Sequence, residues 1–341
     1  MGEKPLRSPG SSTPTGAVAS GAALPSRFFA WSLLWLTGAY LLNVALTFWG
    51  GLPGAASLLG DEPAHWSAYL QAALFPGAIA AAAAQTWRAP QTPLRDDARR
   101  ISDANAMFIR GCFWAVFLIG LADVAITFLR LHGFLEVLAG DSIERTMAHQ
   151  AYRSLYLHAP LIILGFVVAA RRSTLDFPWL ALLVVSAEFL IVLMRAFYTY
   201  PSTYLADLAR FWYSALFLIA SAHTLLAEGH VRVDVFYAGL SRRGKGWVDA
   251  VGAILLGVVS AWTVLIFGTW GDASAITGPL LVFEKTEAEY GAYLKYLIAG
   301  LLGVFAASMT AQFMSQFLAA VADIRGDPPQ DSEDGSPSAA I

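Results

Sequence analysis

Residues 247–270 read WVDAVGAILLGVVSAWTVLIFGTW, an apolar run in which Asp249 is the only charged side chain. A helix needs about 20 predominantly apolar residues to cross the hydrocarbon core of a bilayer. Trp247 and Trp270 stand at the two ends of the run, where aromatic side chains anchor membrane helices at the interface. This stretch therefore predicts a transmembrane helix.

The composition of the whole chain also indicates a membrane protein. Of its 341 residues, 57% are hydrophobic and 14% are charged, and the mean hydropathy is +0.55. A soluble domain is roughly 45–50% apolar and about 25% charged, so a soluble globular protein is excluded. The net charge of −3 argues against nucleic-acid binding, which needs clustered Lys and Arg. The single cysteine, Cys112, excludes an internal disulfide and a CxxC metal site.

Eight stretches are apolar enough to cross the membrane, which predicts an all-α fold, a polytopic integral membrane helical bundle. The fourth stretch is short and could start earlier, near Tyr152. The predicted spans are 28–49, 68–87, 107–129, 155–170, 178–199, 205–227, 247–270 and 292–321.

The basic residues set the orientation, because cytoplasmic loops of membrane proteins are enriched in Lys and Arg. With the N-terminus in the cytoplasm, most Lys and Arg residues fall on the cytoplasmic side. An odd number of helices would break this alternation, so both termini are predicted to be cytoplasmic. The predicted outer loops hold only Arg130, Arg145, Arg153, Lys285 and Lys295, diluted by acidic residues.

Composition divides the chain into four parts. Residues 1–26, rich in Pro, Gly, Ser, Thr and Ala, are predicted to be a disordered cytoplasmic tail. Residues 27–177 form an N-terminal four-helix membrane region, 178–325 a second four-helix domain, and 326–341 an acidic disordered tail. A cleaved signal peptide is the competing interpretation of the start. The first apolar run is longer than the roughly 7–15 residues of a signal peptide's apolar region, which favours a retained helix.

The two halves share a loop pattern that suggests an internal duplication. An offset of 140 residues aligns 144–146 (ERT) with 284–286 (EKT), and Tyr156 with Tyr296. A degenerate repeat in the same orientation is one hypothesis, and chance similarity between apolar helices is the other.

Charged residues inside the predicted spans are functional candidates, because each costs about 2.5–3.5 kcal/mol on insertion scales. Asp123 lies on the third span and Glu188 near the middle of the fifth. Arg195 and Asp207 fall at similar depth on either side of a turn, so an ion pair or snorkelling to the interface would satisfy both. Arg210 follows Asp207 at the start of the sixth span. Glu188 has no partner at its depth in this hairpin and is expected to face another protein helix, with a proton or ion relay as the alternative.

Six histidines raise the alternative of haem ligation, which needs His pairs on facing helices at matched depth. His158 is predicted near the outer end of its helix and His223 near the inner end of its own, so no pair is expected. His65, His132, His149 and His230 fall in predicted loops. No HExxH, GxSxG, Walker A or GxGxxG pattern occurs. No catalytic, cofactor-binding or metal-binding residue is predicted.

The most informative local stretch follows the sixth span and begins GHVRVD at 229–234. It continues with apolar residues 235–237, a short basic turn, and WVD at 247–249. An interfacial segment obeying the positive-inside rule is the simplest interpretation. A sharper one is that His230, Arg232 and Asp234 fix this segment against a partner helix or loop.

Together with the Arg and aromatic cluster at 195–200 and the four-helix spacing, this stretch resembles the small permease subunit (DctQ-like) of tripartite ATP-independent periplasmic (TRAP) transporters. The resemblance covers 178–325 and implies a subunit without catalytic activity that braces a large permease subunit. It also implies a bacterial inner membrane, a periplasmic solute-binding protein that delivers an organic-acid-like solute, and uptake driven by sodium symport. Our hypothesis is that two groups of residues orient helices and hold the partner. They are Gly229, His230, Arg232 and Asp234 at the cytoplasmic face, and Glu188, Arg195, Asp207 and Arg210 in the hairpin.

The chain departs from the usual four-helix small subunit in its four additional N-terminal helices, so the role of 1–177 stays open. Two rival functions also remain. One is a self-sufficient eight-helix secondary transporter that uses Asp123 and Glu188 as coupling carboxylates. The other is a membrane redox subunit that binds haem or quinone through the histidines.

Overall fold

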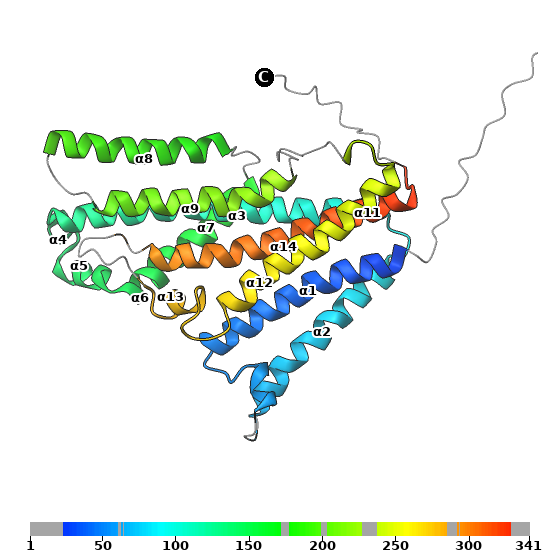
Figure 1. Ribbon diagram of the computed structural model, residues 1–341. Coiled ribbons are helices and arrows are strands. Elements are labelled where there is room, and N and C mark those ends of the chain that lie inside the picture. Colours follow the sequence, from blue (N-terminus) through cyan, green and yellow to red (C-terminus); the bar gives the residue numbers. More distant parts are fainter. Residues whose placement is uncertain are drawn as a thin grey trace, which may run out of the picture.

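A computed structural model describes residues 23–60, 63, 65–171, 177–198, 203–226, 237–284, 292 and 294–328 of the chain. Within these ranges every regular element is a helix, which confirms the all-α prediction (Figure 1). The longer helices are α1 (Ala23–Phe48), α2 (Trp66–Arg88), α3 (Leu94–Leu131), α7 (Ala159–Arg171), α8 (Phe177–Tyr198), α9 (Thr203–Leu226), α11 (Arg242–Gly252), α12 (Val259–Gly268) and α14 (Lys295–Arg325). The shorter ones are η1 (Ala55–Leu59), α4 (Phe134–Ala139), α5 (Asp141–Ala148), α6 (Gln150–Arg153), η2 (Ser154–His158), η3 (Ala253–Val258) and α13 (Thr277–Leu281).

Seven helical stretches in the described ranges are long and apolar enough to cross a membrane. They coincide with seven of the eight predicted spans. The remaining predicted span, the fifth, is α8, a helix of 22 residues whose side chains are described for 181–197. The prediction of a multi-pass helical membrane protein is therefore confirmed.

Some helices extend beyond the predicted spans because their charged residues pair inside the protein. α1 begins at Ala23, five residues before the predicted start at 28. α3 begins at Leu94, more than three turns before the predicted start at 107. The fourth spanning stretch begins at Ala151. The earlier start that was considered, near Tyr152, is therefore confirmed, and Arg153, which was predicted in an outer loop, lies within this helical stretch.

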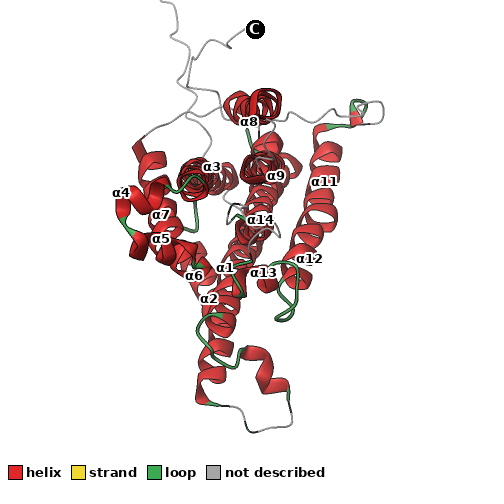
Figure 2. Ribbon diagram, turned by 90° about the vertical axis from the view of Figure 1, so that its left-hand side faces the viewer, coloured by secondary structure: helices red, strands yellow, loops and turns green. Residues whose placement is uncertain are grey.

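α3 and α14 lie at the centre of the bundle. α14 packs against α1, α3, α9, α11 and α12, and α3 packs against α7 and α9 as well (Figures 1 and 2). Ile119 of α3 and Leu208, Trp212 and Ile219 of α9 are buried in the largest apolar cluster. Helices from both predicted four-helix regions therefore share one core.

α7 approaches α3 closely at a glycine. A Cβ atom at Gly165 of α7 would lie 2.6 Å from the backbone nitrogen of Ala115 on α3. Small residues at helix contacts let backbones pack tightly in membranes, where dispersion contacts replace the hydrophobic effect as the driving force. Gly165 therefore sets the spacing of this helix pair.

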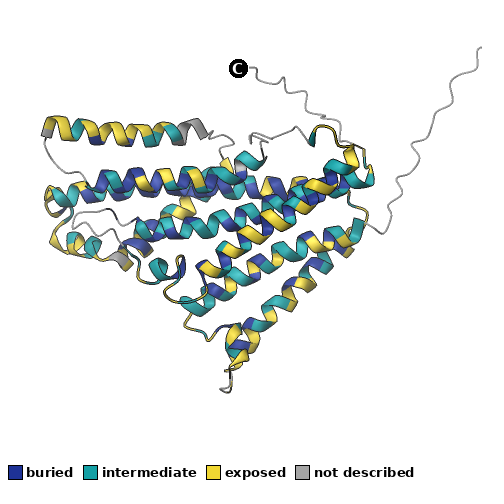
Figure 3. Ribbon diagram, viewed as in Figure 1, coloured by how far each residue is buried: buried dark blue, intermediate teal, exposed yellow. Residues whose placement is uncertain are grey.

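α8 and the α1–α2 hairpin occupy two edges of the bundle. α8 packs against α9 through Leu183, Ala187 and Ile191, and most of its remaining surface is exposed (Figure 3). α2 packs mainly against α1, and Trp35 donates a hydrogen bond to Gln85 at 3.0 Å. These edges present the surfaces that meet lipid or another protein.

Ion pairs join four helices at the predicted cytoplasmic end. Arg27 of α1 lies 2.6 Å from Asp97 of α3, and both side chains are 2% exposed. Asp323 of α14 accepts hydrogen bonds from Arg95 of α3 and Arg242 of α11 at 2.6 and 2.9 Å. The start of α3 is thereby tied to helices at both ends of the chain.

Candidate functional site

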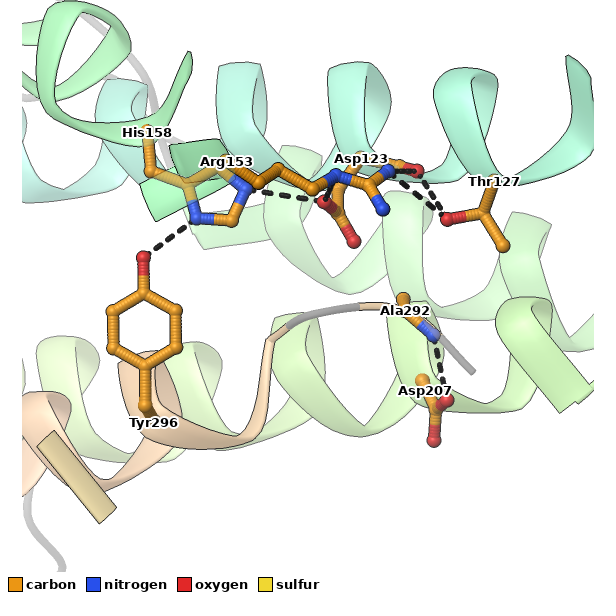
Figure 4. Close-up of polar contacts among 7 residues, drawn as sticks. All are labelled: Asp123, Thr127, Arg153, His158, Asp207, Ala292 and Tyr296. Atoms are coloured by element: carbon orange, nitrogen blue, oxygen red, sulfur yellow. Dashed lines mark hydrogen bonds and ion pairs between the residues drawn. The ribbon is translucent and has the colours of Figure 1, made fainter. Parts of the chain in front are cut away.

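The candidate site is a buried polar network near the predicted outer ends of α3 and α14 (Figure 4). At its centre Asp123 of α3 lies 2.7 Å from the Nε atom of Arg153, and neither side chain is exposed to solvent. The guanidinium also donates to the backbone oxygen of Asp123 at 2.8 Å and to the Thr127 hydroxyl at 3.1 Å. A buried carboxylate is thus neutralised by a buried guanidinium within the protein.

A π-helical turn brings Arg153 and His158 to the same place. The segment η2 spans Ser154–His158 and lies between α6 and α7. In an α-helix, residues five apart point in directions that differ by roughly 140°. A π-helix closes its hydrogen bonds between residues five apart. Arg153 and His158 therefore both reach Asp123.

His158 connects this centre to α14. Its Nε2 lies 3.1 Å from Asp123 Oδ1, and its Nδ1 lies 2.6 Å from the hydroxyl of Tyr296. A neutral imidazole that donates a hydrogen bond from Nε2 to the carboxylate accepts one at Nδ1 from the Tyr296 hydroxyl. The chain of contacts from Asp123 to Tyr296 therefore holds α14 to the N-terminal region.

Asp207 forms a second buried contact at the start of α9. It is 5% exposed, its Oδ2 accepts the backbone N–H of Ala292 at 3.1 Å, and its Oδ1 lies 3.7 Å from Arg210. The expected ion pair between Arg195 and Asp207 is not formed among the described residues. Arg210 is one turn from Asp207 on the same helix, whereas Arg195 is exposed on α8.

Glu188 is exposed on α8, and no described residue of this chain pairs with it. α8 is in contact with α9, but Glu188 does not point into that contact. The protein helix that Glu188 was expected to face is therefore not one of those described here.

The four residues predicted at the cytoplasmic face, Gly229, His230, Arg232 and Asp234, lie outside the described residues. Directly after them, Tyr237 donates a hydrogen bond to Asp249 at 2.6 Å.

The sequence reasoning missed Arg153, which is the pairing partner of Asp123, and Tyr296. Arg153 stands directly before an apolar run and so follows the pattern of an interfacial residue. The five-residue spacing from Arg153 to His158 signals a shared face only if the turn is π-helical. Tyr296 is far away in the sequence.

Residues 183–323 match the family model described as "Tripartite ATP-independent periplasmic transporters, DctQ component". This matched part of the chain is similar to the DctQ component and is called the DctQ domain below. It begins within α8 and ends within α14, which confirms the resemblance over nearly the expected range. Tyr296 and Asp207 belong to the DctQ domain, whereas Asp123, Arg153 and His158 precede it. Comparisons with curated proteins and with solved structures gave no match.

Proposed function

We propose that this chain is the small membrane subunit of a TRAP-type transporter in a bacterial inner membrane, where it braces a large permease subunit. The observation that carries the proposal is the DctQ domain at residues 183–323. On this proposal a periplasmic solute-binding protein delivers an organic-acid-like solute, and a sodium gradient drives its uptake. The chain itself performs no catalysis.

The buried contacts support a bracing role. Asp123 is engaged by Arg153 and His158, and Asp207 by Ala292 and Arg210. A carboxylate that couples transport to an ion must exchange its partner during the cycle. Asp123 instead has a guanidinium and an imidazole packed against it inside the protein, an arrangement suited to holding helices at fixed positions.

The same contacts weigh against the two rival functions. A self-sufficient transporter was expected to use Asp123 and Glu188 as coupling carboxylates, and Asp123 is already engaged by Arg153 and His158. A haem protein was expected to use histidines as axial ligands. In the network of Figure 4, both ring nitrogens of His158 already contact Asp123 and Tyr296.

Co-purification tests the proposal. The tagged chain is expressed together with the neighbouring membrane genes, solubilised in a mild detergent and purified. We expect a large permease subunit to be recovered in stoichiometric amount. A chain that purifies alone and transports solute by itself after reconstitution contradicts the proposal.

A further inference from the structure

We infer that one side of α8 is the docking surface for a transmembrane helix of the large permease subunit. This surface, the Glu188 flank, consists of Val185, Glu188, Val192 and Arg195. The inference rests on the proposed function and adds which face of the chain makes the contact. The docked helix places a hydrogen-bond donor or a cation opposite Glu188.

The depth of Glu188 is the first argument. It lies eleven residues after the first residue of α8 and ten before the last. At a rise of 1.5 Å per residue, the carboxylate is attached about 15 Å or more from either end of the helix. A glutamate side chain is too short to reach the interface from there, and an intramembrane carboxylate facing lipid is costly.

The geometry of α8 is the second argument. Ala187 is buried against α9, and Glu188 projects about 100° away from it around the helix. Arg195 stands seven residues further on, which returns it to nearly the same side. Val185 and Val192, exposed at 63% and 61%, complete this flank. One side of an edge helix therefore carries an acceptor at mid-depth and a cation near its outer end.

The charge pattern selects the occupant. A second copy of this chain, related by a two-fold axis along the membrane normal, would place Glu188 opposite Glu188 at the same depth. Like charges that face each other repel, so self-association through this flank is disfavoured. Lipid provides an acceptable neighbour for Arg195, which can snorkel from its place near the helix end, but not for Glu188. A helix of different sequence with a donor at mid-depth satisfies both positions.

The opposite edge of the molecule has the properties expected of a lipid-facing surface. The exposed large residues of α2 include Trp66, Tyr69, Leu70, Ile79 and Trp87. They are apolar or aromatic, with the two tryptophans at the helix ends, where interfacial anchors lie. The only charged residue of α2 is Arg88, at its end, so this helix has no charge at the middle of the membrane that would require a protein partner.

The first test compares Glu188→Leu with Ser186→Leu in the full chain. Ser186 is exposed about 100° from Ala187 on the other side of α8, at nearly the same depth, which makes it a matched control. We expect Glu188→Leu to reduce recovery of the large permease at least tenfold, a difference of about 1.4 kcal/mol. Ser186→Leu is expected to leave recovery unchanged. Size-exclusion profiles of both variants verify that the chain still folds.

The second test maps the contact by photo-crosslinking in the wild-type background. A photoreactive residue at position 185 or 192 is expected to crosslink to the large permease. The same residue at Leu182 or Phe197, both exposed on the other side of α8, is expected to crosslink weakly or not at all.

The outcomes separate the two proposals. If the wild-type chain recovers no large permease, the proposed function fails and the docking surface fails with it. Suppose instead that the permease is recovered equally with Glu188→Leu and Ser186→Leu, and that crosslinks arise from positions 182 and 197. The proposed docking surface is then wrong, whereas the proposed function still holds.

Discussion

At the scale of single residues, the fold depends on buried charged side chains, each of which needs a partner of opposite charge. Asp123 and Arg153 have no exposure, and each neutralises the other. Taking two charges out of water is expensive, so such a pair contributes little net stability over an apolar pair. Removing one partner, in contrast, leaves an uncompensated buried charge.

Asp123→Asn is therefore expected to destabilise the protein by about 3–5 kcal/mol, because Arg153 then stays buried without its counter-ion. The apparent melting temperature in detergent measures the effect. Cys112 is buried and is the only cysteine, so a thiol-reactive fluorophore reports its exposure on unfolding.

Asp141→Asn is the matched control for this prediction. Asp141 pairs with Arg145, but both side chains are more than half exposed. Exposed pairs contribute about 0–1 kcal/mol, so the melting temperature is expected to stay nearly the same. Equal melting temperatures for the two variants would show that the Asp123 pair is dispensable.

At the scale of elements, helices pack at distances set by small residues. α7 and α3 approach each other closely where Gly165 meets the backbone of Ala115. In an interior packed this closely, a single added methyl group forces the helices apart or strains them.

Gly165→Ala is expected to lower stability by about 1–3 kcal/mol, since the new Cβ collides with a backbone that cannot move independently. Gly303→Ala in α14 is the control, because a Cβ there would meet no atom within 4 Å. That substitution is expected to be neutral or stabilising by up to about 1 kcal/mol. Thermal denaturation of both variants decides the matter, and a harmless Gly165→Ala would contradict the packing described here.

At the scale of the whole molecule, the DctQ domain does not enclose its own core. Its helices α9 and α14 pack against α3 of the N-terminal region. Asn105 of α3 donates to the backbone oxygen of Ser308 at 3.0 Å, and Ser315 of α14 donates to that of Ala98 at 2.7 Å. The N-terminal helices therefore complete the interior of the domain.

A split of the chain tests this dependence. Residues 177–341 expressed alone are expected to aggregate or to melt at a clearly lower temperature, because the buried groups facing α3 become unpaired. Co-expression with residues 1–176 is expected to restore a monodisperse complex by size-exclusion chromatography. A fragment 177–341 as stable as the intact chain would show that the N-terminal region is an independent addition.

The predicted orientation is tested by cysteine labelling in a Cys112→Ala background. Leu59 is 91% exposed in the segment between α1 and α2, and Arg243 is exposed near the start of α11. A membrane-impermeant maleimide is expected to label Leu59→Cys in intact cells. Arg243→Cys is expected to react only after the membrane is permeabilised. The reverse pattern would place both termini outside the cytoplasm.

The internal duplication stays a hypothesis. The aligned residues Tyr156 and Tyr296 occupy different environments, the first 61% exposed and the second 5%. A shared ancestry of the two halves would not by itself preserve such positions, because η2, which carries Tyr156, and α14, which carries Tyr296, have different neighbours.

Local sequence was sufficient to predict the class of the protein, the approximate positions of the spans and the DctQ resemblance. The reason is physical: insertion into a bilayer depends on the hydropathy of about 20 consecutive residues. The motif at 229–249 is likewise contiguous. Only the tertiary structure decided which charges are neutralised. Asp123 meets Arg153 and, through His158, Tyr296 because helices distant in the sequence pack together, and a π-turn rotates the intervening residues. Glu188 stays exposed for the same reason, since the packing of α8 on α9 determines which side of that helix is left for a partner.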